Sequence, residues 1–188
     1  DQFFEQLYNR VEQTDRYIHV WDGELYLEYH RGTYTSQAWI KRINRKLELL
    51  LREAEWLGVI ASVARLGCEY PRDELEKAWR IVLRNQFHDI LPGSAIREVY
   101  EDARREYGQA EKIVRDVWYR LTGLLSRTET QHCFTVFNGT PWKRTDVVFV
   151  SDNRFTDGKW KDQYGKQLVS QRTQDGWLVV VEDVPPFA

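Results

Sequence analysis

The feature that most constrains the fold is a run of apolar residues, three and four positions apart, in the segment that begins at Ser36. This spacing places the apolar side chains on one face of an α-helix and is typical of the seam of a helical bundle. We therefore predict a long helix whose buried face is formed by Ile40, Ile43, Leu47, Leu50, Ala54, Leu57 and Ala61.

Two further helices are expected to complete this bundle. Asp73 and Glu76 have the spacing of a capping box, which predicts a helix start, and Pro92 predicts an end near residues 88–90. A third helix is expected after Ser94, with a buried face of Tyr100, Ala103, Tyr107, Ala110, Val114, Val117, Leu121 and Leu124. The short connections predict an antiparallel three-helix bundle.

The second helix is apolar on more than one face. Its seam is predicted to hold Leu75, Ala78, Trp79, Val82, Gln86 and Asp89. His88 lies outside that seam, and the other flank carries Leu83, Phe87 and Ile90. Because a three-helix bundle cannot cover both flanks, we expect another domain to cover the rest.

The composition after residue 128 favours β-structure. The segments expected to form two antiparallel hairpins are CFTVF (133–137), TDVVFV (145–150), LVSQRT (168–173) and WLVVVEDV (177–184). Asn138-Gly139-Thr140 matches a glycosylation sequon, but an Asn-Gly turn explains it more simply. The predicted fold class is therefore mainly α, with an antiparallel three-helix bundle followed by antiparallel strands.

The start of the chain has a different organisation. Residues 1–13 have the apolar spacing of a helix, and residues 20–36 are expected to be extended and then to form a loop at Gly32. The chain begins at Asp1 and contains no Met, so we interpret it as a piece of a longer protein.

Composition excludes several classes of partner. The chain is 42% hydrophobic, which suffices for a core, and its 27 basic and 29 acidic residues are interspersed, which argues against nucleic acid and anionic lipid. The apolar runs are far shorter than the roughly 20 residues that cross a bilayer. Cys68 and Cys133 are too few for a disulfide framework, which fits a reducing, cytoplasmic compartment.

NQFHDILPGS, residues 85–94, holds the candidate chemistry, because His88 and Asp89 stand side by side at a helix end. From the residues alone, a single His there is more typical of a contact with the last helix carbonyls than of a zinc ligand, since a zinc site needs three or four donors. His19, His30 and His132 are scattered singly. Asp89 is either an ordinary carboxylate at the helix C-terminus, where the dipole disfavours it, or a ligand or substrate acceptor.

Three segments resemble a known family. Residues 23–57 (GELYLEYHRGTYTSQAWIKRINRKLELLLREAEWL), 85–103 (NQFHDILPGSAIREVYEDA) and 136–150 (VFNGTPWKRTDVVFV) resemble glycoside hydrolase family 38, the class II α-mannosidases. The resemblance implies a catalytic-barrel tail over 1–35, the three-helix middle domain over 36–127, and the start of an incomplete β-sandwich domain over 128–188.

The resemblance also implies a function. His88 would be one ligand of a single Zn2+ ion whose other ligands lie in the N-terminal catalytic domain of the same chain, and Asp89 would bind mannose hydroxyls. The full-length parent would be a retaining glycosidase acting on terminal α-mannosides. No catalytic carboxylate is expected in this fragment, which would be inactive alone.

Two alternatives stay open. The bundle could be a non-catalytic helical interaction module, in which case replacing His88 would alter stability or docking but not metal content. Within the family, the substrate could instead be a small mannosyl compound such as mannosylglycerate. The motifs separate neither the substrates nor a monomer from a homo-oligomer.

Overall fold

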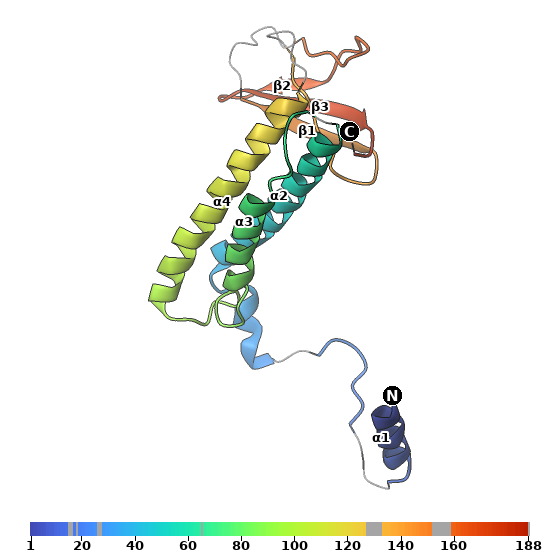
Figure 1. The fold of residues 1–188 in the computed structure, drawn as a ribbon. Coiled ribbons are helices and arrows are strands. Elements are labelled where there is room, and N and C mark those ends of the chain that lie inside the picture. The colour runs from blue at the N-terminus through green and yellow to red at the C-terminus, as the bar shows by residue number, and fades with distance from the viewer. Residues whose placement is uncertain are drawn as a thin grey trace.

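The computed structural model describes residues 1–14, 17, 19–25, 28–64, 66–126, 133–151 and 159–187. Its helices are α1 (Gln2–Glu12), the 3-10 helix η1 (Glu28–Tyr34), α2 (Ala38–Val63), α3 (Arg72–Asn85) and α4 (Arg97–Leu125), and its strands are β1 (Arg144–Val150), β2 (Ser170–Arg172) and β3 (Trp177–Val184). This order confirms the predicted fold class, a bundle followed by antiparallel strands (Figure 1).

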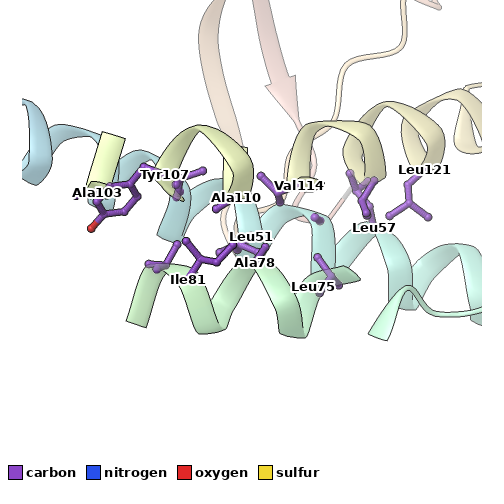
Figure 2. Packing of buried hydrophobic residues seen from close by; sticks show 14 of the residues in the cluster. Leu51, Leu57, Leu75, Ala78, Ile81, Ala103, Tyr107, Ala110, Val114 and Leu121 are labelled. Atoms are coloured by element: carbon purple, nitrogen blue, oxygen red, sulfur yellow. The ribbon is translucent and has the colours of Figure 1, made fainter. Parts of the chain in front are cut away.

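The bundle is held by one apolar core to which all three helices contribute. Figure 2 shows apolar side chains of this core, which meet between α2, α3 and α4. The buried members are Ile40, Leu47, Leu51, Ala54, Leu57, Ala61, Leu75, Ala78, Ile81, Val82, Tyr100, Ala103, Tyr107, Ala110, Val114, Val117 and Leu121. Consecutive helices run in opposite directions, as the short connections predict (Figure 1).

The predicted seams shift by one residue in places. Leu50 is only half-buried and Leu51 is fully buried, while Leu124 is 42% exposed and Leu125 packs against the core instead. The predicted seam positions alternate in steps of three and four, which average 3.5, whereas a straight α-helix has 3.6 residues per turn. The seam therefore moves to the next residue along.

The predicted capping box is wrong. The first helical residue of α3 is Arg72, directly after Pro71, and no side chain caps this end among the described residues. Asp73 consequently lies inside the first turn, where its charge still suits the helix dipole. Pro71 occupies the N-cap position and, having no backbone N–H, leaves no amide there that would need a partner.

The end of α3 is also earlier than predicted. The helix ends at Asn85, and residues 86–93 follow as hydrogen-bonded turns rather than as helix to residues 88–90. Gly93 has φ +96°, a conformation that favours glycine, and Pro92 disfavours helix at the residue before it. The chain therefore turns back toward α4 over these residues.

The sheet lies at the end of the bundle where α2 and α4 finish (Figure 1). Strand β3 is central, with the order β1-β3-β2 and antiparallel pairs Val150↔Trp177 and Arg172↔Trp177. The Arg172↔Trp177 pair confirms the second predicted hairpin. Val150, Trp177 and Val179 form a small second core.

The first predicted hairpin is wrong. Residues 133–137 form no strand in the described chain, because this segment crosses from the bundle to the sheet and Phe137 packs against the bundle core. Asn138, which follows, is 3% exposed and donates to the carbonyls of Trp142, Val184 and Pro185 at 2.9, 3.1 and 2.8 Å. A glycan attached to the Asn138 side-chain nitrogen would break these hydrogen bonds. Asn138 therefore has a structural role.

The N-terminal part lies apart from the bundle (Figure 1). Helix α1 confirms the predicted helix over residues 1–13, and it buries no residue although Phe3, Phe4 and Leu7 share its apolar face. The prediction that residues 20–36 are extended and then form a loop is only partly borne out, because the 3-10 helix η1 begins at Glu28 and includes Gly32.

Candidate functional site

The candidate site is the turn of residues 86–93, at the end of the bundle remote from the sheet (Figure 1). The amides of Ile90 and Leu91 donate to the carbonyl of Phe87 at 2.9 and 3.1 Å, and the amide of Gly93 donates to the carbonyl of Ile90 at 3.1 Å. These local bonds give the turn a defined shape, with His88 and Asp89 near its start.

His88 and Asp89 lie close together and are open to solvent. The side chain of His88 is 79% exposed and that of Asp89 is 57% exposed, and 3.4 Å separates His88 Nε2 from Asp89 Oδ2. The His88 ring also contacts the Phe87 ring, with centroids 4.2 Å apart. A nitrogen and an oxygen donor are thus presented together on an accessible surface.

A partly buried polar network connects this turn to α2. Gln86 donates from Nε2 to Asn44 Oδ1 and to Glu48 Oε1, each at 3.0 Å, and Asn44 donates to the same Glu48 oxygen at 3.0 Å. The network links α2 to the first residue after α3. It ties the start of the turn to α2 because the Gln86 amide donates to two side chains of that helix.

A second polar cluster anchors the end of α3 to α4. Asn85 is 1% exposed and donates to Glu106 Oε2 at 2.7 Å, while Arg84 pairs with Glu106 at 2.6 Å. The hydroxyl of Tyr100 accepts a bond from the amide of Ala95 at 2.9 Å and lies 3.4 Å from the carbonyl of Asp89. The backbone that carries His88 and Asp89 is therefore held from two neighbouring helices.

Metal ligation by the described residues alone is incomplete. No group of three or more His, Cys, Asp or Glu side chains in the described ranges could hold a metal ion. His88 offers an imidazole nitrogen and Asp89 a carboxylate oxygen, which are donors that zinc accepts, but a zinc site takes about four ligands. The pair fits a part of a metal site whose remaining ligands come from elsewhere.

The other residues that sequence reasoning considered do not join this site. His30 lies in η1, where its carbonyl accepts a bond from Thr33 at 2.6 Å, and Cys68 donates to the carbonyl of Glu69 at 3.2 Å. His132 lies outside the described residues. The sequence analysis did not single out Lys41, which contacts the turn across 50 positions of sequence.

No described helix is long and apolar enough to cross a membrane. Taken together, the fold and the turn define a three-helix-bundle domain, joined to a β-sheet region, that presents an exposed His-Asp pair at one end.

Known proteins are similar to this chain in sequence. Residues 28–123 match the family model of the alpha mannosidase middle domain. Alpha-mannosidase 2C1 of Mus musculus is 36% identical over 151 residues, which cover 76% of this chain and 14% of that protein. Alpha-mannosidase of Saccharomyces cerevisiae is 37% identical over 129 residues, which cover 68% of this chain and 11% of that protein.

Solved structures show the same fold. A crystal structure of an alpha-mannosidase from Enterococcus faecalis matches with a TM-score of 0.64 at 19% identity, over 98% of this chain and 27% of that one. The chain belongs to glycoside hydrolase family 38, the α-mannosidases, and contains the middle domain of that family. It spans 11% to 14% of the length of these two curated relatives.

Proposed function

We propose that the parent protein is a zinc-dependent α-mannosidase that hydrolyses terminal α-mannosides. This chain supplies His88 as one ligand of a single zinc ion and Asp89 as a substrate-binding residue, and the catalytic domain of the same polypeptide supplies the rest. The observation that carries the proposal is the exposed His-Asp pair at the end of α3, in a chain that belongs to this family.

The two side chains have distinct roles. His88 would ligate zinc through a ring nitrogen, and its exposed ring leaves room for ligands from another domain. Zinc supplies Lewis-acid binding of sugar hydroxyls. Asp89 accepts hydrogen bonds from hydroxyls of the mannose, because an ionised carboxylate is an acceptor on both oxygens.

The remaining chemistry is assigned to residues outside this chain. Retaining glycosidases use two carboxyl groups about 5 Å apart, one as nucleophile and one as acid and base. We assign neither to this chain, so the chain alone is expected to be inactive. The proposed division is a catalytic-domain tail over 1–35, the middle domain over 36–127 and the start of a β-sandwich domain over 128–188.

One proposed boundary, at residues 127 and 128, lies outside the described residues. We propose a cytoplasmic location for the parent, because this chain has only two cysteines, as is typical of proteins in a reducing compartment. The exposed side chains of Leu83 on α3 and Phe87 in the turn after it also suit the alternative of a docking module, and the following experiment separates the two functions.

The test compares the full-length parent with its His88→Ala and Asp89→Asn variants, and with His19→Ala as a matched exposed control. His88→Ala is expected to lose zinc and to lower kcat/KM for an aryl α-mannoside by more than about 100-fold, beyond the usual effect of outer-shell changes. Asp89→Asn should retain zinc and lower kcat/KM by roughly 10- to 100-fold, since it weakens one charged hydrogen bond.

The measurements are zinc content by metal analysis, hydrolysis rates on aryl mannoside and mannosylglycerate, and folding by circular dichroism. A folded His88→Ala enzyme with full zinc and full activity would show that His88 is only a helix-end residue and would favour the docking module. Preference for mannosylglycerate would assign the narrower substrate.

A further inference from the structure

Lys41 links the candidate site to a second segment of the chain. It lies in the first turn of α2, and its ammonium donates to the carbonyl oxygens of Ser36, Leu91 and Pro92 at 2.5, 2.9 and 3.2 Å. A lysine ammonium has three N–H donors, so all three are used. The carbonyls of Leu91 and Pro92 belong to the 86–93 turn, which also carries His88 and Asp89. The carbonyl of Ser36 belongs to the segment that precedes α2.

The two segments are in close contact at this point. A Cβ atom on Gly93 would lie 2.7 Å from Ser36 Cβ and 2.9 Å from the Ser36 carbonyl oxygen, so only glycine permits the approach. Residues 30–36, HRGTYTS, lie in one of the segments that resemble the family, and the proposed function assigns them no role. Lys41 is the cation that binds carbonyls from both sides of this contact.

The surroundings of Lys41 favour a local role over a contribution to the core. Its side chain is partly buried and is not a member of the apolar cluster, and burial lowers the pKa of its ammonium. Desolvating a charge is unfavourable unless hydrogen bonds compensate, and here three carbonyls do so. Removing Lys41 would therefore leave the core intact and release the turn.

We propose that Lys41 is a positioning residue that holds the 86–93 turn against the segment before α2, so that His88 and Asp89 face the shared active site. The inference rests on the proposed function, because it assumes that this pair binds zinc and substrate. Lys41 acts through the backbone carbonyls that it binds and touches neither zinc nor sugar.

The test uses the full-length parent with Lys41→Met, and Lys46→Met as a matched control. Lys46 lies on the same helix and pairs with Glu111 at 2.6 Å, away from the turn. Lys41→Met is expected to increase deuterium uptake in residues 86–94 and 32–37, and to weaken zinc affinity by about 10- to 100-fold in competition with a chelator, as outer-shell changes do. Lys46→Met should change neither.

A fall of kcat/KM at saturating zinc is the readout that a purely structural role would not move. A second variant, Lys41→Arg, keeps the charge and should recover only part of the zinc affinity, because a planar guanidinium does not match three converging carbonyls. This variant keeps the proposal testable if Lys41→Met fails to fold.

Unchanged exchange in the turn, or faster exchange with normal zinc affinity and normal kcat/KM, would overturn the positioning role and leave the proposed function intact. A wild-type parent that binds no zinc would instead contradict the proposed metal site. In that case the exchange pattern together with kcat/KM still decides the role of Lys41.

Discussion

Tyr107 shows how the bundle interior alters the chemistry of one side chain. The residue is 1% exposed, and its hydroxyl lies 3.5 Å from Asn44 Oδ1. Burial, and then the charges of Glu48 and Glu106, raise the pKa of Tyr107 to about 12 from its ordinary value of 10. The fold therefore favours the neutral phenol.

This pKa predicts an alkaline loss of stability. Above about pH 10 the unfolded chain releases the Tyr107 proton while the folded chain retains it, so the contribution present below pH 10 is lost between pH 10 and about 12. The loss amounts to about 2–3 kcal/mol over that window. The Tyr107→Phe variant has no phenol to titrate, so it should not show this alkaline loss. At pH 8 it should be up to about 1 kcal/mol less stable than the wild type, and near pH 12 it should be more stable than the wild type.

Urea unfolding at several pH values measures both curves. Tyr164→Phe is the control, because Tyr164 is 86% exposed and its removal should leave the pH dependence unchanged. Parallel curves for wild type and Tyr107→Phe up to pH 12 would contradict the raised pKa.

At the scale of elements, the turn between α3 and α4 decides where the candidate site lies. Gly93 has φ +96° and stands against Ser36, so the turn depends on the absence of a side chain at this position. Gly108 is an opposite case, since it lies inside α4 with nothing within 4 Å of an added Cβ.

The two glycines predict substitutions of opposite sign. Gly93→Ala should lower the free energy of unfolding by about 1–3 kcal/mol, because of backbone strain and the clash with Ser36. Gly108→Ala should raise it by about 0.5–1 kcal/mol, because alanine is the better helix former. Chemical denaturation of both variants measures this, and equal effects would refute the assigned turn geometry.

Helix existence was predictable at this scale, whereas helix ends were not. The periodicity of residues 40–61 and 100–121 reports burial, and burial is what stabilises these helices. The predicted cap at Asp73 failed because Pro71 starts the helix earlier, and the predicted strand at 133–137 failed because Phe137 packs on the bundle. The first outcome depends on a proline two residues away, and the second depends on a tertiary contact that local spacing does not specify.

At the scale of the whole molecule, two apolar faces stay uncovered in the described chain. Leu83 on α3 and Phe87 in the turn that follows it are 57% and 51% exposed, and Phe3, Phe4 and Leu7 of α1 are also exposed. The match covers only 14% of the length of the mouse relative, which fits the proposal that further domains of the parent cover these faces.

If another domain of the parent covers Phe87, a substitution there should have different effects in the isolated chain and in the parent. In the isolated chain, Phe87→Ser should change the free energy of unfolding by no more than about 0.5 kcal/mol, as exposed substitutions do. In the full-length parent the same substitution should cost about 1–2 kcal/mol, because an apolar side chain would leave a covered interface. Unfolding measured on both proteins provides the comparison, and equal effects would argue against domain docking on this flank.

The sequence by itself determined the three helices, the antiparallel strands after them and the family, because apolar periodicity and long motifs are local properties. Only the tertiary structure decided where α3 ends, which residue of each seam is buried, and how Lys41, Ser36 and Gly93 meet beside His88. The meeting of Lys41, Ser36 and Gly93 depends on contacts between residues about 50 positions apart, and such contacts form only when the helices pack.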